Sequence, residues 1–457
     1  MLEDKVIKEI ISAVGQDKVF TEPEDLTCYA CDVSTYVARP DLVVRVEKEA
    51  DVKAVLKIAN KEKIAVVPRG AATNNCGGAV PIEGGIILDM VAMDKIIEVD
   101  KENLIAVCEP GVITGVLQSE VEKIGLFYPP DPQGLNMSTI GGNVALDAGG
   151  PRAVKYGVTR DYVMGLETVL ASGEVIRTGG KIVKDVSGYN LTQLLVGSEG
   201  TLGVVTKVIL KLVPLPEAKR TMMCVFDELD HAAVAVTKIL DHNIVPSMLE
   251  LLDKSSIRLI QDYMDAGYPT DAEAILLIEV DGSKSDVDQQ ITMIKNICGE
   301  SQARETTVAR TEAEETAIWA GRKSGFAALA AYKPVVLPED CTVPRNKLPE
   351  MIRKVQEIAK KYNVLLPTFG HAGDGNAHPH ICYDPRIPEE VEKAKKLKDE
   401  IYHEALKLGG TITGEHGVGI VKKHLLKFQH GETNLQLMAG IKQLFDPNNI
   451  LNPGKSI

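Results

Sequence analysis

The order of apolar and polar positions in the first part of the chain predicts a β-α-β unit. An apolar run at 42–46 is followed by apolar residues at helical spacing (Val52, Val55, Leu56 and Ala59) and by a second apolar run at 64–67. Two apolar runs joined by one amphipathic helix are typical of strands that flank a crossover helix.

The pattern changes after Pro216. Strands are expected at 221–226, 247–252 and 273–280, with helices at 230–240 and 285–297 and helical residues between the second and third strands. This alternation predicts an α+β, ferredoxin-like layer. Helices near 348–358 and 389–407 flank a histidine-rich segment, and the turn-rich stretch 444–455 is expected to pack against an earlier domain.

Composition indicates a globular protein. The 457 residues are 44% hydrophobic and 25% charged, which is enough for two or three domains. A net charge of −13 without a basic run argues against nucleic acid or an anionic membrane surface as partner. The first residues lack the pattern of a secretory signal and no stretch is long enough to span a bilayer, so we expect a cytoplasmic protein.

Eight scattered cysteines do not form a disulfide framework, and Cys28-x-x-Cys31 has no second pair with which to hold an iron–sulfur cluster.

Three glycine-rich tracts, at 70–78, 139–157 and 197–203, predict one extended ligand. Any single Gly-Gly pair is adequately explained by a tight turn, but three tracts with Ser, Thr and Asn between them offer backbone and hydroxyl groups to a pyrophosphate and a polar heterocycle. Neither G-x-G-x-x-G nor G-x-x-x-x-G-K-[ST] occurs, so NAD on a doubly wound sheet and a nucleotide triphosphate on a P-loop have no support.

Two short segments, 370–378 and 414–417, gather three histidines and a glutamate among glycines. Gly373 and Gly375 disfavour a helix, so His371 and His378 are expected to converge from a bent loop. Imidazole with carboxylate suits Zn, Fe or Mn, whereas Mg or Ca prefers oxygen ligands alone. His380 is left outside this set because, on a strand, it can point the other way.

The motifs taken together resemble the FAD-linked 2-hydroxyacid dehydrogenases of the vanillyl-alcohol oxidase and p-cresol methylhydroxylase superfamily, a family that includes glycolate oxidase catalytic subunits and D-lactate dehydrogenases. The residues that carry the resemblance cover most of the chain: 68–70, 77–81, 129–132, 139–143, 149–150, 155–157, 196–203, 371–378, 415–417 and 452–454.

The resemblance implies an FAD-binding domain of two α+β subdomains (1–217), a ferredoxin-like cap domain that binds substrate (218–410) and a C-terminal segment that returns to the FAD domain (411–457). FAD is expected to bind non-covalently, because no histidine precedes His231 to attach it. The cofactor-binding residues implied are Arg69, Gly70, Ala71, Ala72, Thr73, Asn74, Gly77, Gly78, Pro130, Asp131, Ser138, Thr139, Gly141, Gly142, Asn143, Gly149, Gly150, Tyr156, Glu199, Gly200, Gly203, Val204, Val205 and Asn452.

The implied reaction is oxidation of a small 2-hydroxy acid, D-lactate or glycolate, to the 2-oxo acid by hydride transfer to flavin N5. His371, His378 and Glu415 are the expected ligands of a divalent metal that lowers the pKa of the substrate hydroxyl. His416, which is similar to the catalytic histidine of the family, is the expected base.

Arg322 matches the position of the family's substrate-binding arginine, and a guanidinium can grip a carboxylate with two hydrogen bonds. The alternative for Arg322 is a solvated helix arginine. Asn376 is expected either to orient the substrate or to fix its loop. Pro338 stands where relatives that take larger dicarboxylates carry a lysine, which favours a monocarboxylate.

Electrons must leave through a partner, because the chain shows neither a nicotinamide site nor cluster-binding cysteines. An electron-transferring flavoprotein, an iron–sulfur subunit and a quinone are the candidates. Two alternatives stay open: the same fold acting on a larger substrate such as 2-hydroxyglutarate or an alkyl-glycerone phosphate, and a non-catalytic flavoprotein subunit. The enantiomer, the metal and the oligomeric state are also open.

Overall fold

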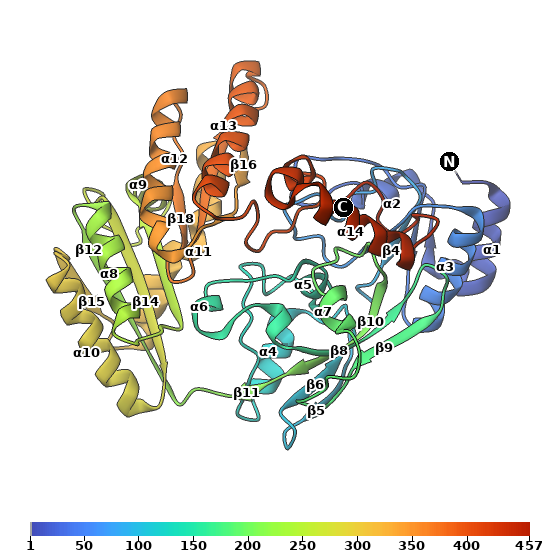
Figure 1. The fold of residues 1–457 in the computed structure, drawn as a ribbon, viewed down its shortest axis with the longest axis horizontal. Coiled ribbons are helices and arrows are strands. Elements are labelled where there is room, and N and C mark those ends of the chain that lie inside the picture. Colours follow the sequence, from blue (N-terminus) through green and yellow to red (C-terminus); the bar gives the residue numbers. More distant parts are fainter. Residues whose placement is uncertain (1) are drawn as a thin grey trace. The chain divides into compact units, whose positions relative to one another are not determined.

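The computed structural model describes residues 2–457, which divide into two compact units (Figure 1). Unit 1 contains residues 2–149, 158–215 and 415–457, and unit 2 contains residues 150–157 and 216–414. Each unit has its own sheets, and each is described separately below.

The first sheet of unit 1 contains the predicted β-α-β unit. Its strand order is β1 (Val19–Phe20), β2 (Leu42–Arg45), β4 (Ile86–Asp89) and β3 (Val66–Arg69). Strands β2 and β3 both pair in parallel with β4, and α3 (Glu49–Glu62) makes the crossover between them. The face of α3 that carries Val52, Val55 and Leu56 is buried, as its spacing predicts. The sequence pattern missed only that β4 inserts between the two predicted strands.

The second sheet of unit 1 is antiparallel, and a two-stranded ribbon lies apart from it. The sheet order is β5 (Ile96–Asp100), β6 (Ile105–Cys108), β10 (Val204–Lys211), β8 (Val163–Val169) and β9 (Val175–Gly179), and the ribbon joins β7 (Leu126–Phe127) to β11 (Val213–Pro214). The other helices of this unit are α1 (Asp4–Val14), α2 (Pro23–Cys28), α4 (Thr114–Glu122), α5 (Ile140–Leu146), α7 (Leu191–Leu195) and α14 (Leu426–Phe445). Burial alternates along β10, so one face of this strand packs inward.

The C-terminal end of unit 1 is held by the first sheet. Leu451 forms a parallel bridge with Val66, and the Asn452 N–H donates to the Val66 carbonyl at 2.8 Å. The buried Asp446 carboxylate accepts the N–H groups of Ile450 and Leu451. The segment is therefore part of the same core as β3.

Unit 2 is built on a sheet whose first four strands have the ferredoxin-like order. The full order is β15 (Glu305–Val308), β12 (Ala218–Phe226), β14 (Ala274–Gly282), β13 (Met248–Asp253), β18 (Thr368–His371), β19 (Asn376–Tyr383) and β16 (Val335–Pro338), with β17 (Cys341–Thr342) also paired to β19. In chain order the first four strands read 4-1-3-2, with α8 (Leu229–Asp241) and α10 (Lys284–Glu300) as crossovers. The predicted ferredoxin-like layer is confirmed.

Helices cover both faces of this sheet. β14 is buried along its length on both faces, and its core partners Leu252, Ile260, Trp319 and Phe369 include residues from α9 (Lys254–Tyr263) and α11 (Glu312–Tyr332). The predicted helices α12 (Leu348–Tyr362) and α13 (Pro388–Lys407) lie side by side, as Figure 1 shows. The short helix α6 (Ala153–Tyr156) also belongs to unit 2.

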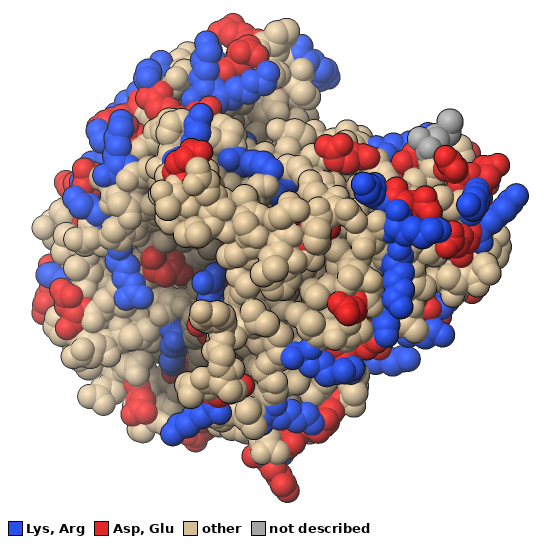
Figure 2. All heavy atoms as spheres, turned by 45° about the vertical axis from the view of Figure 1, so that its right-hand side comes forward, with Lys and Arg blue, Asp and Glu red and all other residues tan. Residues whose placement is uncertain are grey.

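On the face that Figure 2 draws, Lys and Arg side chains lie interspersed with Asp and Glu, with uncharged surface between them. Among residues 2–457, no helix has both the length and the apolar character that crossing a bilayer requires.

Asp253 caps the N-terminus of α9 and makes the stability of unit 2 depend on pH. Its carboxylate accepts the N–H groups of Ser256 and Thr368. Burial raises its pKa to about 6 from the ordinary value of 3.8, although these donors oppose the effect. The protonated form is thus favoured in the folded state, so its stabilising contribution is present below about pH 4 and is lost as the pH rises through about 6.

We expect Asp253→Asn to flatten the change in unfolding free energy between about pH 4 and pH 6 and to stabilise the protein at pH 7 by up to about 3 kcal/mol. The amide keeps an oxygen for the two N–H donors but carries no charge. Urea unfolding across this pH range measures the effect. The exposed Asp288→Asn is the control, and equal pH slopes for wild type and Asp253→Asn would contradict the prediction.

Candidate active site

Three neighbouring strands of unit 2 bring the site side chains onto one face. Glu250 on β13 lies directly opposite His371 on β18, and His371 lies opposite Asn376 on β19. Directly opposed residues of antiparallel strands point to the same face, and so do residues two apart, which adds His378 to the group. The predicted bent loop is thus a β-hairpin: His371 ends one strand, His378 lies within the next, and 372–375 form the turn. Gly375, with φ 85°, takes the conformation that the turn requires.

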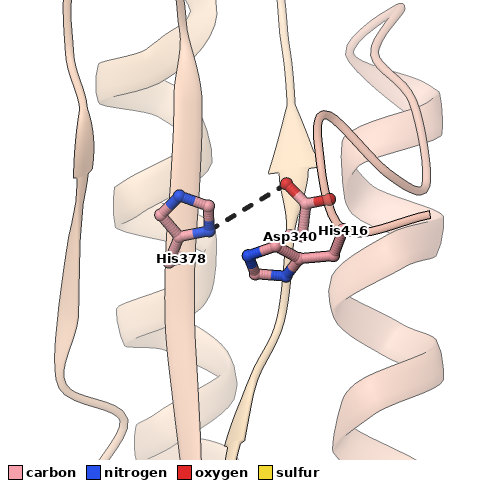
Figure 3. A group of neighbouring side chains, drawn as sticks. All are labelled: Asp340, His378 and His416. Carbon is pink, nitrogen blue, oxygen red and sulfur yellow. Dashed lines mark ion pairs between the residues drawn. The ribbon is translucent and has the colours of Figure 1, made fainter. Parts of the chain in front are cut away.

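Both imidazoles are buried and are held through Nδ1. His371 Nδ1 lies 2.5 Å from the Glu250 Oε1 atom, and His378 Nδ1 lies 3.2 Å from the Glu339 carbonyl oxygen. His378 Nδ1 is also 3.9 Å from the Asp340 carboxylate, the ion pair dashed in Figure 3. With an acceptor at each Nδ1, the proton belongs there, and Nε2 carries the lone pair that a metal needs. One ring nitrogen of each histidine lies within 4.8 Å of the other's.

Two buried oxygens of unit 2 also need a partner. The Asn376 Oδ1 and Thr342 Oγ1 atoms receive no hydrogen bond from any of residues 2–457. A buried polar atom that lacks a hydrogen bond costs stability, so such atoms are usually matched by a ligand or water. Two imidazole nitrogens this close together are donors that suit zinc or a divalent transition metal.

Arg322 lies on α11 and is buried, not solvated. Its Nε and Nη2 atoms are each 2.8 Å from the Glu250 Oε2 atom, and its guanidinium stacks over the Phe369 ring at 4.4 Å. Burial by itself raises the pKa of Glu250, but the charges of His371 and Arg322 and their hydrogen bonds outweigh it and hold the pKa at about 2. Glu250 is therefore ionised, and it neutralises the arginine. Nη1 takes no part in this pair.

His380 points to the same face as His378, because the two residues lie two positions apart on β19. Its ring packs on Phe369, with centroids 4.1 Å apart, and its Nδ1 lies 3.2 Å from the Pro367 carbonyl oxygen. The expectation that it points the other way is wrong, yet its contacts are those of a core histidine. Pro338 pairs with His380 in the strand register.

Asp340, which no sequence motif indicates, is hydrogen-bonded to the last residues of unit 2. Its Oδ2 atom accepts the Thr413 hydroxyl at 2.7 Å and the Gly414 N–H at 2.8 Å. Glu415 and His416, the latter drawn in Figure 3, follow Gly414 directly and open the last segment of unit 1.

A cavity in unit 1 that is open to solvent is lined by residues of the glycine-rich tracts. The predicted cofactor residues line it, apart from Gly77, Pro130, Asp131, Gly149, Gly150, Tyr156 and Asn452. Its walls also include Ser198, which lies in the third glycine-rich tract, and Pro68 and Ala79, which lie in motifs that carry the resemblance. The remaining lining residues have no sequence signal that separates them from core residues: Met90, Pro110, Ala145, Leu146 and Leu195.

The cavity walls are too close to allow side chains at several glycines. A Cβ atom at Gly70 would lie 2.3 Å from Thr139 Oγ1, one at Gly141 would lie 2.5 Å from Pro110 Cβ, and one at Gly203 would lie 2.4 Å from Thr168 Cγ2. These glycines allow the close packing of the wall, and because they line the cavity, their backbone can be approached closely by a phosphate, which fits a dinucleotide such as FAD.

Two of the predicted residues outside the cavity have other contacts. The Asn452 amide donates to the carbonyls of Gly78 and Glu199 at 3.0 and 2.7 Å, so it connects two residues of the cavity wall. Tyr156 belongs to unit 2, where its hydroxyl donates to Asp281 at 2.7 Å.

Glu199 joins the cavity to the C-terminal segment. Its carboxylate oxygens accept the N–H groups of Val418 and Gly419, both at 2.8 Å. Burial raises the pKa of Glu199, and these two donors oppose the effect. Residues beyond 414 are therefore needed to complete the wall.

Comparison with known families matches both units. Residues 215–456 match the family "FAD linked oxidases, C-terminal domain", and residues 40–179 match "FAD binding domain". The chain therefore belongs to the FAD linked oxidases, and it is an FAD-dependent enzyme. The resemblance seen in the sequence is confirmed.

Relatives are similar over nearly the full length. The chain is 45% identical over 456 residues to glycolate oxidase subunit GlcD of Bacillus subtilis, covering 100% of this chain and 97% of that protein. It is 38% identical to a D-lactate dehydrogenase of Anaerostipes hadrus, covering 92% and 90% of the two chains. The fold is shared with p-cresol methylhydroxylase, with a TM-score of 0.83, 19% identity and coverage of 99% and 96%. The predicted fold class is thus confirmed.

Gly200 provides a test of the FAD cavity. Its φ is +70°, and a Cβ atom there would lie 2.7 Å from the Pro68 ring, which cannot move aside easily. We expect Gly200→Ala to weaken FAD binding about tenfold or more, because the wall must shift. Flavin absorbance during FAD titration of the apoprotein measures the affinity.

The matched control is Gly188→Ala, since Gly188 has a similar φ of +86° but a Cβ atom there would meet no other atom within 4 Å. Equal FAD affinity in both variants would show that the Gly200 contact does not shape the site.

Proposed function

We propose that this chain oxidises a small 2-hydroxy acid, D-lactate or glycolate, to the 2-oxo acid. The observation that carries the proposal is the pair of buried imidazoles at His371 and His378, which lie with Asn376 and the buried Arg322 in unit 2. The relatives named glycolate oxidase subunit and D-lactate dehydrogenase support this class of substrate.

Bound FAD supplies a two-electron acceptor, and a bound divalent ion supplies the positive charge that makes the substrate hydroxyl more acidic. His371 and His378 hold the ion through Nε2, because Nδ1 of each ring faces an acceptor. Glu415 is the proposed third ligand. Zinc, iron and manganese all suit this set.

His416 is the proposed base for the hydroxyl proton. Support comes from covalent geometry: the Gly414 N–H is bonded to Asp340, which lies beside His378, and His416 is two residues further along the chain. Two residues reach at most about 7 Å. Imidazole suits the role because it titrates near neutral pH.

Arg322 is proposed to bind the substrate carboxylate through the Nη1 edge that Glu250 does not use. Asn376 is proposed to orient the substrate through its side-chain oxygen or nitrogen. Pro338 places no charge opposite His380, which favours a monocarboxylate over a hydroxydicarboxylate such as 2-hydroxyglutarate.

We further propose that electrons pass to a separate protein, an electron-transferring flavoprotein or an iron–sulfur subunit. The word "subunit" in the name of the Bacillus subtilis relative supports a protein partner. Isolation of the native complex identifies that partner, and rapid quinone reduction by the isolated chain would contradict the proposal.

The function is tested by anaerobic mixing of the purified flavoprotein with D-lactate, L-lactate, glycolate and 2-hydroxyglutarate. We expect D-lactate or glycolate to bleach the flavin absorbance fastest. Bleaching by 2-hydroxyglutarate alone would assign the larger substrate, and bleaching by none of them would sink the proposal.

Two variants separate the proposed roles. We expect His371→Ala to lose stoichiometric metal, measured by elemental analysis, because one of the two ring nitrogens is gone. We expect His416→Ala to keep metal and FAD but to lower the rate of flavin reduction by about 10²–10⁴, the usual range for a general base. His231→Ala, on the surface of α8, is the control. A His416→Ala protein that reduces its flavin at the wild-type rate would exclude His416 as the base.

A further inference from the structure

One carboxylate in unit 2 serves two of the proposed functional side chains at once. Glu250 has no exposed surface, and its two oxygens are divided between partners: Oε1 faces His371 Nδ1, and Oε2 accepts from Arg322 Nε and Nη2. The carboxylate therefore connects a proposed metal ligand to the proposed substrate-binding arginine.

We propose that Glu250 is a positioning residue that sets the tautomer of His371 and the direction of the Arg322 guanidinium together. The inference rests on the proposed roles of these two residues and assigns a role to a third that the family comparisons do not mention. In this role Glu250 acts through His371 and Arg322, to which both of its carboxylate oxygens are bonded.

Glu250 fixes the orientation of the His371 ring. An imidazole whose Nδ1–H is held by a carboxylate presents Nε2 as the ligand, and the carboxylate raises the basicity of that nitrogen. The strand register fixes the geometry, because Glu250 and His371 are direct cross-strand neighbours on β13 and β18. Rotation of the imidazole would break this bond.

Glu250 also fixes the orientation of Arg322. Its long side chain comes from α11 and would have many rotamers on a surface. Here the Glu250 Oε2 atom fixes one edge of the guanidinium, and the Phe369 ring at 4.4 Å fixes its plane. The opposite edge is thus aimed before any substrate arrives, which is the condition for tight carboxylate binding.

A neutral amide cannot replace this carboxylate. The glutamine in Glu250→Gln has one acceptor oxygen for two sets of donors, and its NH₂ group faces the N–H groups of one partner. Either the imidazole or the guanidinium then loses its anchor. Loss of the shared carboxylate should therefore weaken both metal binding and substrate binding, whereas loss of the arginine should weaken substrate binding alone.

The experiment compares three variants of the FAD-loaded protein. Zn²⁺ affinity is measured by titration after chelator treatment, and KM and kcat are measured with the 2-hydroxy acid that wild type oxidises fastest. We expect Glu250→Gln to weaken Zn²⁺ binding by about 10–100-fold and to raise KM about tenfold or more. We expect Arg322→Met to raise KM but to keep wild-type Zn²⁺ affinity, since Glu250 still holds His371.

The matched control is Glu279→Gln. Glu279 is also buried in the same sheet, but its partners are Ser247 and Lys219. It should keep both wild-type Zn²⁺ affinity and wild-type KM. Glu250→Asp keeps the charge and should retain more Zn²⁺ affinity than Glu250→Gln, and it replaces that variant if the glutamine prevents folding, as judged by circular dichroism.

Wild-type Zn²⁺ affinity and KM in Glu250→Gln would overturn the inference, and so would equal losses in Glu279→Gln. Failure of the proposed function gives a different result. A wild-type protein that binds no divalent ion contradicts the metal centre and the claim that Glu250 positions His371. The claim that Glu250 positions Arg322 is then tested by the KM of Glu250→Gln. A wild-type protein that oxidises none of the acids contradicts the proposed reaction. The claim that Glu250 positions His371 is then tested by the Zn²⁺ affinity of Glu250→Gln.

Discussion

An ionised glutamate without solvent exposure is stabilised inside unit 2 by an imidazole and a guanidinium that both donate to it. The pairing of this glutamate with the imidazole depends on the register of β13 and β18. A slip of one residue between β13 and β18 would turn His371 to the other face and leave Glu250 with an unmatched charge. The electrostatic cost of such a slip makes the site and the sheet depend on one another, so the chemistry of the cluster also specifies the fold around it.

Much of the fold could be predicted from the sequence because its signals are local. The β-α-β unit at 42–69 and the alternating elements of 218–300 follow from apolar spacing alone. The extension of the ferredoxin-like sheet by β18, β19 and β16 could not be predicted in the same way, since the pairing of β13 with β18 joins Glu250 to His371, 121 positions further along the chain. The glycines around Asp374 indicated a turn correctly, but they did not show that both flanks are strands.

The sequence predicted some residues of the candidate site and missed others, because only some of them have a local sequence signal. Histidines among glycines are conspicuous, and the glycine tracts of the proposed FAD cavity are conspicuous as well. Glu250 and Asp340 are single acids within apolar or mixed segments, and their importance comes only from what they face in three dimensions. Arg322 could be placed on a helix, but its burial and its pairing with Glu250 require the position of β13 relative to α11. Residues that act through other residues leave little trace in sequence.

Unit 1 closes its cofactor cavity with residues from the far end of the chain. Glu199 is bonded to the backbone at 418–419, and Asn452 braces the carbonyls of Gly78 and Glu199. All of unit 2 from 216 to 414 intervenes. During synthesis on the ribosome, all of residues 216–414 emerge before the segment that completes this wall, so the proposed flavin pocket can form only after residues 418 and 419 have been added. A product truncated before residue 418 would leave the ribosome with an unfinished pocket.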